Sequence, residues 1–152
     1  MKPFIEVFVA GTPKAQPRAR AFARGGKASV FNPATAEGWK SLIAQAIKDE
    51  IPETPITGPL KLKVQFFFER PKKPFYIRKT GNVLREDAPL WHTAKPDMDN
   101  LIKAVKDCLT TLRVWQDDSQ VCMYGTSTKE YIDSIQTTPG ALITITQLHE
   151  TE

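Results

Sequence analysis

The sequence predicts a single α+β domain, in which a mixed sheet of about five strands packs against two main helices. Its 152 residues are the length of one domain, and they contain no repeat and no second composition, so residues 1–152 are assigned to one unit. Apolar residues alternate with polar ones in some segments and recur at helical spacing in others. The hydrophobic fraction of 41% and the charged fraction of 25% are ordinary for a globular protein.

The first third of the chain predicts a strand, a loop and a helix. The strand covers residues 4–10, where the pattern alternates before Gly11-Thr12-Pro13. Prolines and Gly25-Gly26 indicate a loop as far as residue 32, with one short strand at residues 28–31. The helix covers residues 33–51, with Asn32 as cap and Pro33 at its first position. Its apolar residues recur at helical spacing: Trp39, Leu42, Ile43, Ala46 and Ile47.

The rest of the chain predicts a second helix and three further strands. A strand over residues 60–70 places Leu60, Leu62, Val64 and Phe66 on one face. Residues 70–95 are rich in basic side chains and are expected to form a long mobile loop. The helix in "KPDMDNLIKAVKDCL" follows, with Met98, Leu101, Ile102, Val105, Leu109 and Leu112 on one side. Two strands are then expected in "SQVCMYGTSTKEY" and "GALITITQL".

Composition excludes several classes of protein. The net charge of +4 permits binding to nucleic acid without requiring it. Cys108 and Cys122 form no CxxC pair, and with only two histidines a zinc site of cysteine and histidine is not supported. No apolar run approaches the length of a membrane span, and the start of the chain does not fit a signal peptide. We therefore expect a cytoplasmic protein with reduced thiols.

The acidic residues around the second helix suggest a metal site. Pro96 favours an extended entry into Asp97, and side chains two apart in an extended segment point the same way. Asp97 and Asp99 therefore converge if the helix begins no earlier than Asp99. Two carboxylates about 4 Å apart repel by about 4 kcal/mol near a protein surface, and a cation between them removes that cost. Oxygen ligands favour Mg²⁺ or Mn²⁺, with Asp118 or Asp117 as a third ligand.

Structural explanations exist for the same residues. An acidic residue at a helix start is usually a cap, and an Asp-Asp pair is usually part of a turn. Lys103 lies one helical turn after Asp99, where it is placed to hold a phosphate or support the carboxylates, and Lys103 with Asp107 is the spacing of an ordinary surface pair. The pattern taken alone leaves both readings open.

The motif as a whole resembles that of the RusA family of Holliday junction resolvases, which phages and prophages typically encode. The family pattern is a Pro, Asp-x-Asp-Asn, a Lys, a further Asp, and later Asp-Asp-x-Gln-Val. The matching residues here are Pro96, Asp97, Asp99, Asn100, Leu101, Lys103, Asp107, Asp117, Asp118, Gln120 and Val121. The opening "GTPKAQPRARAF" resembles the family's basic turn more loosely, and Thr110-Thr111 stands where many relatives carry a glycine.

This resemblance implies a homodimeric Mg²⁺-dependent endonuclease of DNA recombination and repair, which resolves four-way junctions by paired symmetric nicks. It implies metal ligands at Asp97, Asp99 and Asp118 and a catalytic lysine at Lys103, with Mn²⁺ as an alternative ion. Asp117 is the weaker candidate of its pair, and Asp107 is expected to orient Lys103. Two other functions stay open beside it, a junction-binding protein that does not cut and a basic adaptor protein. A nuclease that prefers flaps or forks is the related alternative.

Basic residues in two loops are the candidates for binding the DNA backbone. They are Arg18, Arg20, Arg24 and Lys27 in the first loop, and Lys72 and Lys73, with Arg78 and Lys79, in the second. Each one alone is more simply explained as a solvated surface charge. The aromatic residues Phe75, Tyr76 and Trp91 can stack at an opened junction or pack in the core or at a dimer interface.

Overall fold

The computed structural model describes residues 4–17, 21–24, 27–30, 34–71, 84 and 86–149. For residues 21–24, 27–30, 34 and 35 it describes the backbone alone. The predicted cap Asn32 and first helical residue Pro33 lie outside these ranges, as do Phe75 and Tyr76.

A mixed five-stranded sheet forms the centre of the domain, which confirms the predicted α+β class. β1 (Ile5–Ala10) pairs antiparallel with β7 (Gly140–Gln147), and β7 pairs antiparallel with β4 (Leu60–Phe68). β5 (Val121–Tyr124) and β6 (Thr128–Tyr131) both pair in parallel with β4, one after the other along its length. The strands β4 and β7 therefore lie in the interior of the sheet.

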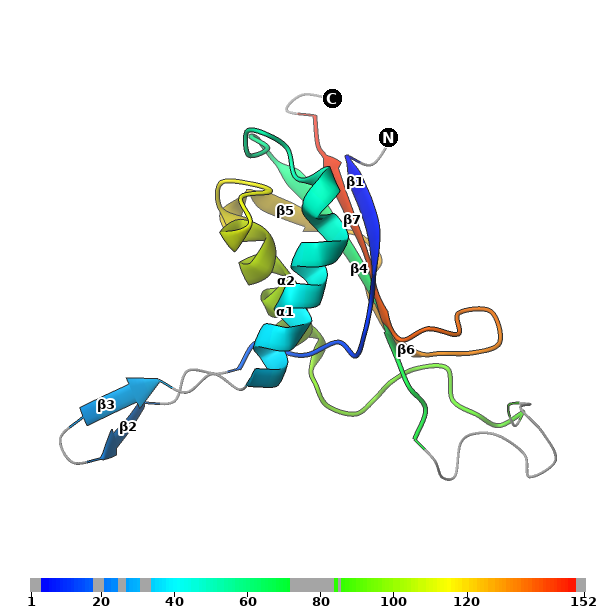
Figure 1. The fold of residues 1–152 in the computed structure, drawn as a ribbon. Helices are drawn as coiled ribbons and strands as arrows, with labels where there is room; N and C mark the ends of the chain where they lie inside the picture. The colour runs from blue at the N-terminus through cyan, green and yellow to red at the C-terminus, as the bar shows by residue number, and fades with distance from the viewer. Residues whose placement is uncertain are drawn as a thin grey trace.

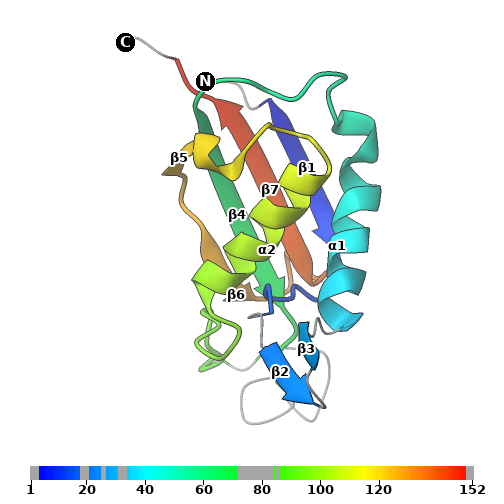
Figure 2. The same cartoon turned by 90° about the vertical axis from the view of Figure 1, so that its left-hand side faces the viewer.

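Both helices cover the same face of this sheet (Figures 1 and 2). α1 (Ala34–Ile47) continues into the short 3-10 helix η1 (Lys48–Glu50), and α2 (Met98–Thr111) lies beside it over the central strands. The predicted helix at 33–51 is thus confirmed, although its last turn tightens into the 3-10 form. Such tightening is common at helix ends.

The core lies between the helices and the sheet. The residues of β4 that were predicted to share one face, Leu60, Leu62, Val64 and Phe66, are all fully buried there. The apolar side of α2 packs against them through Leu101, Val105 and Leu109, which are also fully buried. Removing such a side chain from water contributes about 1.5–3 kcal/mol, so this layer fixes the orientation of α2 and leaves its polar side outward.

Two predictions of local structure were wrong. The short strand predicted at residues 28–31 is confirmed as β3 (Lys27–Val30), but β2 (Ala21–Arg24) falls in the predicted loop, and the two strands form an antiparallel hairpin apart from the main sheet. The Gly25-Gly26 pair, which separates the two strands in the sequence, is a hairpin signal, whereas composition alone favours a loop there. In the second case, the strand expected in "SQVCMYGTSTKEY" is divided into β5 and β6.

A tight approach to β4 explains why β5 ends where it does. The backbone N–H of Gly125 donates to the carbonyl of Leu62 at 2.8 Å. A Cβ atom at Gly125 would lie 2.9 Å from the Lys63 Cβ, which is closer than van der Waals contact allows. Ser127 Oγ then accepts from the N–H of Val64 at 3.1 Å, in place of a strand partner. The side chain of Ser127 therefore bridges the gap between β5 and β6.

The end of the predicted long loop is paired with the sheet. Trp91 forms an antiparallel bridge with Glu130 of β6, and the N–H of His92 donates to the carbonyl of Lys129 at 2.9 Å. The side chain of Trp91 is 54% exposed, so it does not belong to the core. Among the helices of the described ranges, none has the length and apolar character needed to cross a membrane.

Candidate active site

The first turn of α2 places the Asp97-Met98-Asp99 motif at the surface. Asp97 is the N-cap residue, with an extended backbone as predicted (φ −73°, ψ 149°), and its carbonyl accepts the first helical bond from the N–H of Leu101 at 3.0 Å. Its carboxylate makes no capping hydrogen bond. The helix begins at Met98, one residue earlier than the convergence of Asp97 and Asp99 required, so Asp99 lies within the first turn.

The two residues of the second acidic pair, Asp117 and Asp118, have different roles. Asp117 caps η2 (Asp118–Gln120), and its Oδ1 accepts from the N–H of Ser119 at 2.8 Å. Hydrogen bonds from the backbone and the side chain of Ser119 lower the pKa of the exposed Asp117 carboxyl, and one from Asp118 lowers it further. All of them act by stabilising the charged form of the carboxyl. The structural explanation therefore holds for Asp117. Asp118 is the first residue of this 3-10 turn.

Gln120 fastens this turn to the body of the domain. Its Oε1 accepts from the N–H groups of Gln116 and Asp117 at 2.8 and 2.9 Å. Its Nε2 donates to the carbonyls of Ile56 and Gly58 at 2.9 and 3.0 Å. The Gln of the Asp-Asp-x-Gln motif thus holds the loop that carries Asp118, and we assign it a structural role.

A hollow of about 620 Å³ lies between α2, η2 and β5. That volume lies within the usual range for a ligand site. Asp99 and Lys103 of α2 line it together with Asp118 of η2. The described residues that line it are Met98, Asp99, Ile102, Lys103, Lys106, Asp118 and Tyr124.

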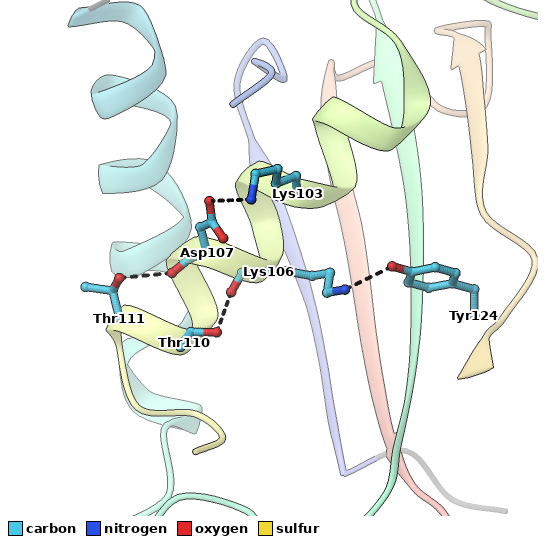
Figure 3. A network of polar contacts seen from close by, with 6 residues as sticks. All are labelled: Lys103, Lys106, Asp107, Thr110, Thr111 and Tyr124. Carbon is cyan, nitrogen blue, oxygen red and sulfur yellow. Dashed lines mark hydrogen bonds and ion pairs between the residues drawn. The ribbon is translucent and has the colours of Figure 1, made fainter. Parts of the chain in front are cut away.

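Lys103 and Asp107 form an ion pair along α2, with 3.7 Å between Nζ and Oδ2 (Figure 3). The lysine side chain is 60% exposed and the aspartate 30% exposed, so the pair is worth well under 1 kcal/mol to stability. This contact agrees with the expectation that Asp107 orients Lys103. The ion pair matters for position and little for stability, because it restricts where the Lys103 ammonium group can lie.

The predicted site residues are brought together only in part. Asp99, Lys103 and Asp118 line the hollow, whereas Asp97 does not. Within the described residues, no group of three or more His, Cys, Asp or Glu side chains is placed to hold a metal ion. The three-carboxylate ligand set therefore stays a prediction.

The predicted DNA-binding residues are not described as side chains. Arg18, Arg20, Lys72, Lys73, Arg78 and Lys79 lie outside the described residues. Arg24 and Lys27 face each other in the register of the β2–β3 hairpin, and only their backbone is described. The chain that leads to them is attached to the site, because the N–H of Gln16 donates to the carbonyl of Asn100 in α2 at 3.0 Å.

Two lining residues were missed by the sequence analysis. Lys106 is not among the predicted site residues, and Tyr124 lies in the part of a predicted strand that the structure confirms as β5, without a predicted role in the site. The spacing of Lys106 three residues after Lys103 was the available signal, since residues i and i+3 share a helix face. Nothing in the local sequence pairs Lys106 with Tyr124, because that contact depends on how β5 lies against α2.

Comparison with known proteins agrees with this arrangement of fold and motif. The family model "Endodeoxyribonuclease RusA" matches residues 10–146, and this chain belongs to that family. It is 38% identical over 117 residues to "Uncharacterized protein YqaN" of Bacillus subtilis (strain 168). That match covers 77% of this chain and 81% of the relative. It is 37% identical over 82 residues to "Crossover junction endodeoxyribonuclease rusA" of Lactococcus phage r1t, and that match covers 53% of each protein.

Proposed function

We propose that this protein is a Mg²⁺-dependent endonuclease that resolves four-way DNA junctions by paired nicks, in recombination and repair inside the cell. The observation that carries the proposal is the hollow that Asp99, Lys103 and Asp118 line together. Family membership supports an endodeoxyribonuclease activity. The name of the phage relative supports the junction as substrate, although the match spans about half of that relative.

The donor atoms of the hollow fit a hard divalent cation. Asp99 and Asp118 offer carboxylate oxygens, and the described residues that line the hollow include no histidine or cysteine. Asp97 is adjacent in sequence and its carboxylate does not cap the helix, which makes it the candidate for a third ligand. Mg²⁺ or Mn²⁺ would supply charge neutralisation and activation of water when bound there.

The reaction would be hydrolysis of a phosphodiester. A water oxygen forms a bond to phosphorus, the bond from phosphorus to the 3′ oxygen breaks, and the products are a 5′-phosphate and a 3′-hydroxyl. Negative charge grows on the phosphate oxygens in the transition state, and the Lys103 ammonium would stabilise that charge. Asp107 would hold Lys103 in place through the ion pair.

Paired nicks need two equivalent active sites. A four-way junction has two-fold symmetry, so a two-fold dimer of this chain would present one site to each of two opposed strands. The dimer is part of the proposal, and light scattering on the purified protein tests it separately. A monomer at the concentration used for cleavage would contradict the paired mechanism while leaving single-strand nicking possible.

The test is cleavage of a labelled four-way junction and of a matched linear duplex, with Mg²⁺ and with a chelator. Symmetric nicks on the junction alone, dependent on Mg²⁺, are expected. Asp99→Asn, Asp118→Asn and Asp97→Asn should each abolish cleavage and leave junction binding intact. Mn²⁺ in place of Mg²⁺ and a forked substrate are run beside them.

Asp117→Asn is the matched control. It removes the same charge one residue from Asp118, and the asparagine oxygen can still cap η2. Cleavage by this variant should stay within a few-fold of the wild type. Binding without cutting under every metal would contradict the enzyme and indicate a protein that holds junctions without resolving them.

A further inference from the structure

Lys106 is the second cation of the hollow and differs from Lys103 in its surroundings. Both lysines line the hollow with Asp99 and Asp118. They are three residues apart on α2, which separates them by about 4.5 Å along the helix axis. Lys103 lies against the carboxylate of Asp107 at 3.7 Å. Lys106 instead reaches across to β5, away from that ion pair (Figure 3).

Tyr124 holds the Lys106 ammonium group at the far wall of the hollow. Lys106 Nζ donates to the Tyr124 hydroxyl at 3.1 Å and lies 5.5 Å from the centre of its ring. The hydroxyl oxygen accepts this hydrogen bond without cancelling the charge of the ammonium group. An ammonium group carries three donors, and the tyrosine takes one of them. The others are available to an anion in the hollow.

The position of Tyr124 is itself fixed by the fold. It is the last residue of β5, and Gly125 follows it in close contact with β4. The Gly125 N–H bond to Leu62 anchors the strand end at that point. Tyr124 is 53% exposed, so its side chain is accessible to a molecule in the hollow. The pairing with Lys106 accounts for where its hydroxyl points.

We propose that Lys106 is a second phosphate-binding residue of this site and that Tyr124 is its positioning residue. Lys106 would bind the phosphate next to the one that is cleaved, because it lies one helical turn from Lys103 and points toward β5. It would act on binding of the DNA rather than on the chemical step. This inference rests on the proposed function, since it takes DNA as the occupant of the hollow.

The test measures the affinity for a four-way junction in chelator, as a function of salt from about 50 to about 200 mM. Lys106→Gln should weaken binding about tenfold, as expected for one lost bond to a charged group. It should also make the slope of log K against log salt shallower by about one, because one phosphate contact is lost. Lys106→Arg should keep the wild-type slope. Tyr124→Phe should weaken binding by a smaller factor with the slope unchanged, since the charge remains and only its anchor is lost.

Steady-state cleavage with Mg²⁺ gives the second readout. Lys106→Gln should raise KM by a similar factor and leave kcat near that of the wild type. The matched control is Lys48→Gln, which removes the same charge from η1, an element that does not line the hollow. A salt slope for Lys106→Gln equal to that of Lys48→Gln would overturn the inference, and so would a fall in kcat without a change in KM.

Failure of this inference can be distinguished from failure of the proposed function. If the wild type cuts junctions and the Lys106 variants bind like the control, only the role of Lys106 is wrong. If the wild type neither binds nor cuts branched DNA, the proposed function is wrong and the inference fails with it.

Discussion

The contrast between Asp117 and Asp118 shows how neighbouring residues of one type acquire different roles. The Asp117 carboxylate accepts a hydrogen bond from the N–H of Ser119, whereas Asp118 lines the hollow. At the start of α2 the order is different, because the N-cap Asp97 leaves its carboxylate out of the cap. A carboxylate at a helix start that makes no capping hydrogen bond is available to bind a ligand, so it is the better candidate for a role in catalysis.

Cys108 and Cys122 should differ in reactivity. Burial raises the pKa of the Cys108 thiol to about 11, with Lys40 opposing and Glu37 adding to that shift. The thiolate is the reactive form, so Cys108 should be inert at neutral pH, whereas Cys122 is exposed. We expect one thiol per chain to react with a disulfide reagent in the folded protein and both to react after unfolding. In Cys122→Ser, rapid labelling of the folded protein would contradict this prediction.

His92 should make stability depend on pH. Burial lowers its pKa, and the nearby charge of Lys129 lowers it further. Its ring stacks on Phe68, with 4.0 Å between centroids, and its Nδ1 is buried without a hydrogen bond to any residue that the structure describes. Because the unfolded chain takes up the proton more readily, stability is complete above about pH 6.5 and falls as the pH drops from there through the lowered value.

Thermal melting at a series of pH values checks this. The wild type should lose melting temperature between about pH 7 and about pH 5, and His92→Phe should lose less, because it keeps an aromatic ring on Phe68 and has no group to protonate. The control is His149→Gln, which changes the other histidine of the chain, an exposed one. Equal pH dependence in His92→Phe and in the wild type would exclude His92 as the cause.

At the scale of elements, the end of α2 determines how the chain turns toward Asp118. The N–H of Arg113 donates to Thr110 and that of Val114 to Leu109, a pattern that normally has glycine at the residue with positive φ. Here that residue is Arg113, with φ 63°. The helix end is instead supported by Thr110, whose Oγ1 donates to the Lys106 carbonyl at 2.9 Å and accepts from the Trp115 indole at 2.7 Å.

Arg113→Gly should therefore raise stability. A side chain in the left-handed region costs about 1 kcal/mol, and glycine removes that cost. Arg113 is exposed, so little packing is lost with it. Urea unfolding should show a gain of up to about 1 kcal/mol. Arg113→Ala is the control, because it keeps the Cβ atom and should show no such gain; a gain of equal size in both variants would contradict the explanation.

The elements also show what could be predicted from the sequence. The face of β4 and the buried side of α2 were correct because their periodicity is long and regular. The division of β5 from β6 was missed, since it depends on the contact of Gly125 with Lys63 and on Ser127 bonding to Val64. The motif predicted Asp97, Asp99, Lys103 and Asp118, of which all but Asp97 line the hollow. The pairing of Lys106 with Tyr124 could not be predicted, because it depends on the packing of β5 beside α2.

At the scale of the whole molecule, the helices cover one face of the sheet and the β2–β3 hairpin lies apart from it (Figure 1). The segment before the hairpin is attached at Gln16 to Asn100, at the first turn of α2. Arg18 follows Gln16 by two residues in the sequence. The last described residue before Arg18 is Pro17, and the segment that ends there therefore lies beside the first turn of α2.

Arg18→Ala combined with Arg20→Ala should weaken junction binding and make its salt slope shallower by up to about two, because each lost phosphate contact keeps its counterions bound to the DNA. The matched control is Lys61→Ala with Lys63→Ala, which removes the same charge from β4 positions that alternate with its buried face. Fluorescence anisotropy over a salt series measures both.

Since phosphate contacts release their counterions independently, adding Lys106→Gln to the arginine pair should reduce the slope by about one more. A slope unchanged in the arginine pair and reduced in the lysine pair would place the DNA on the helix-free face of the sheet, away from Asp99 and Asp118.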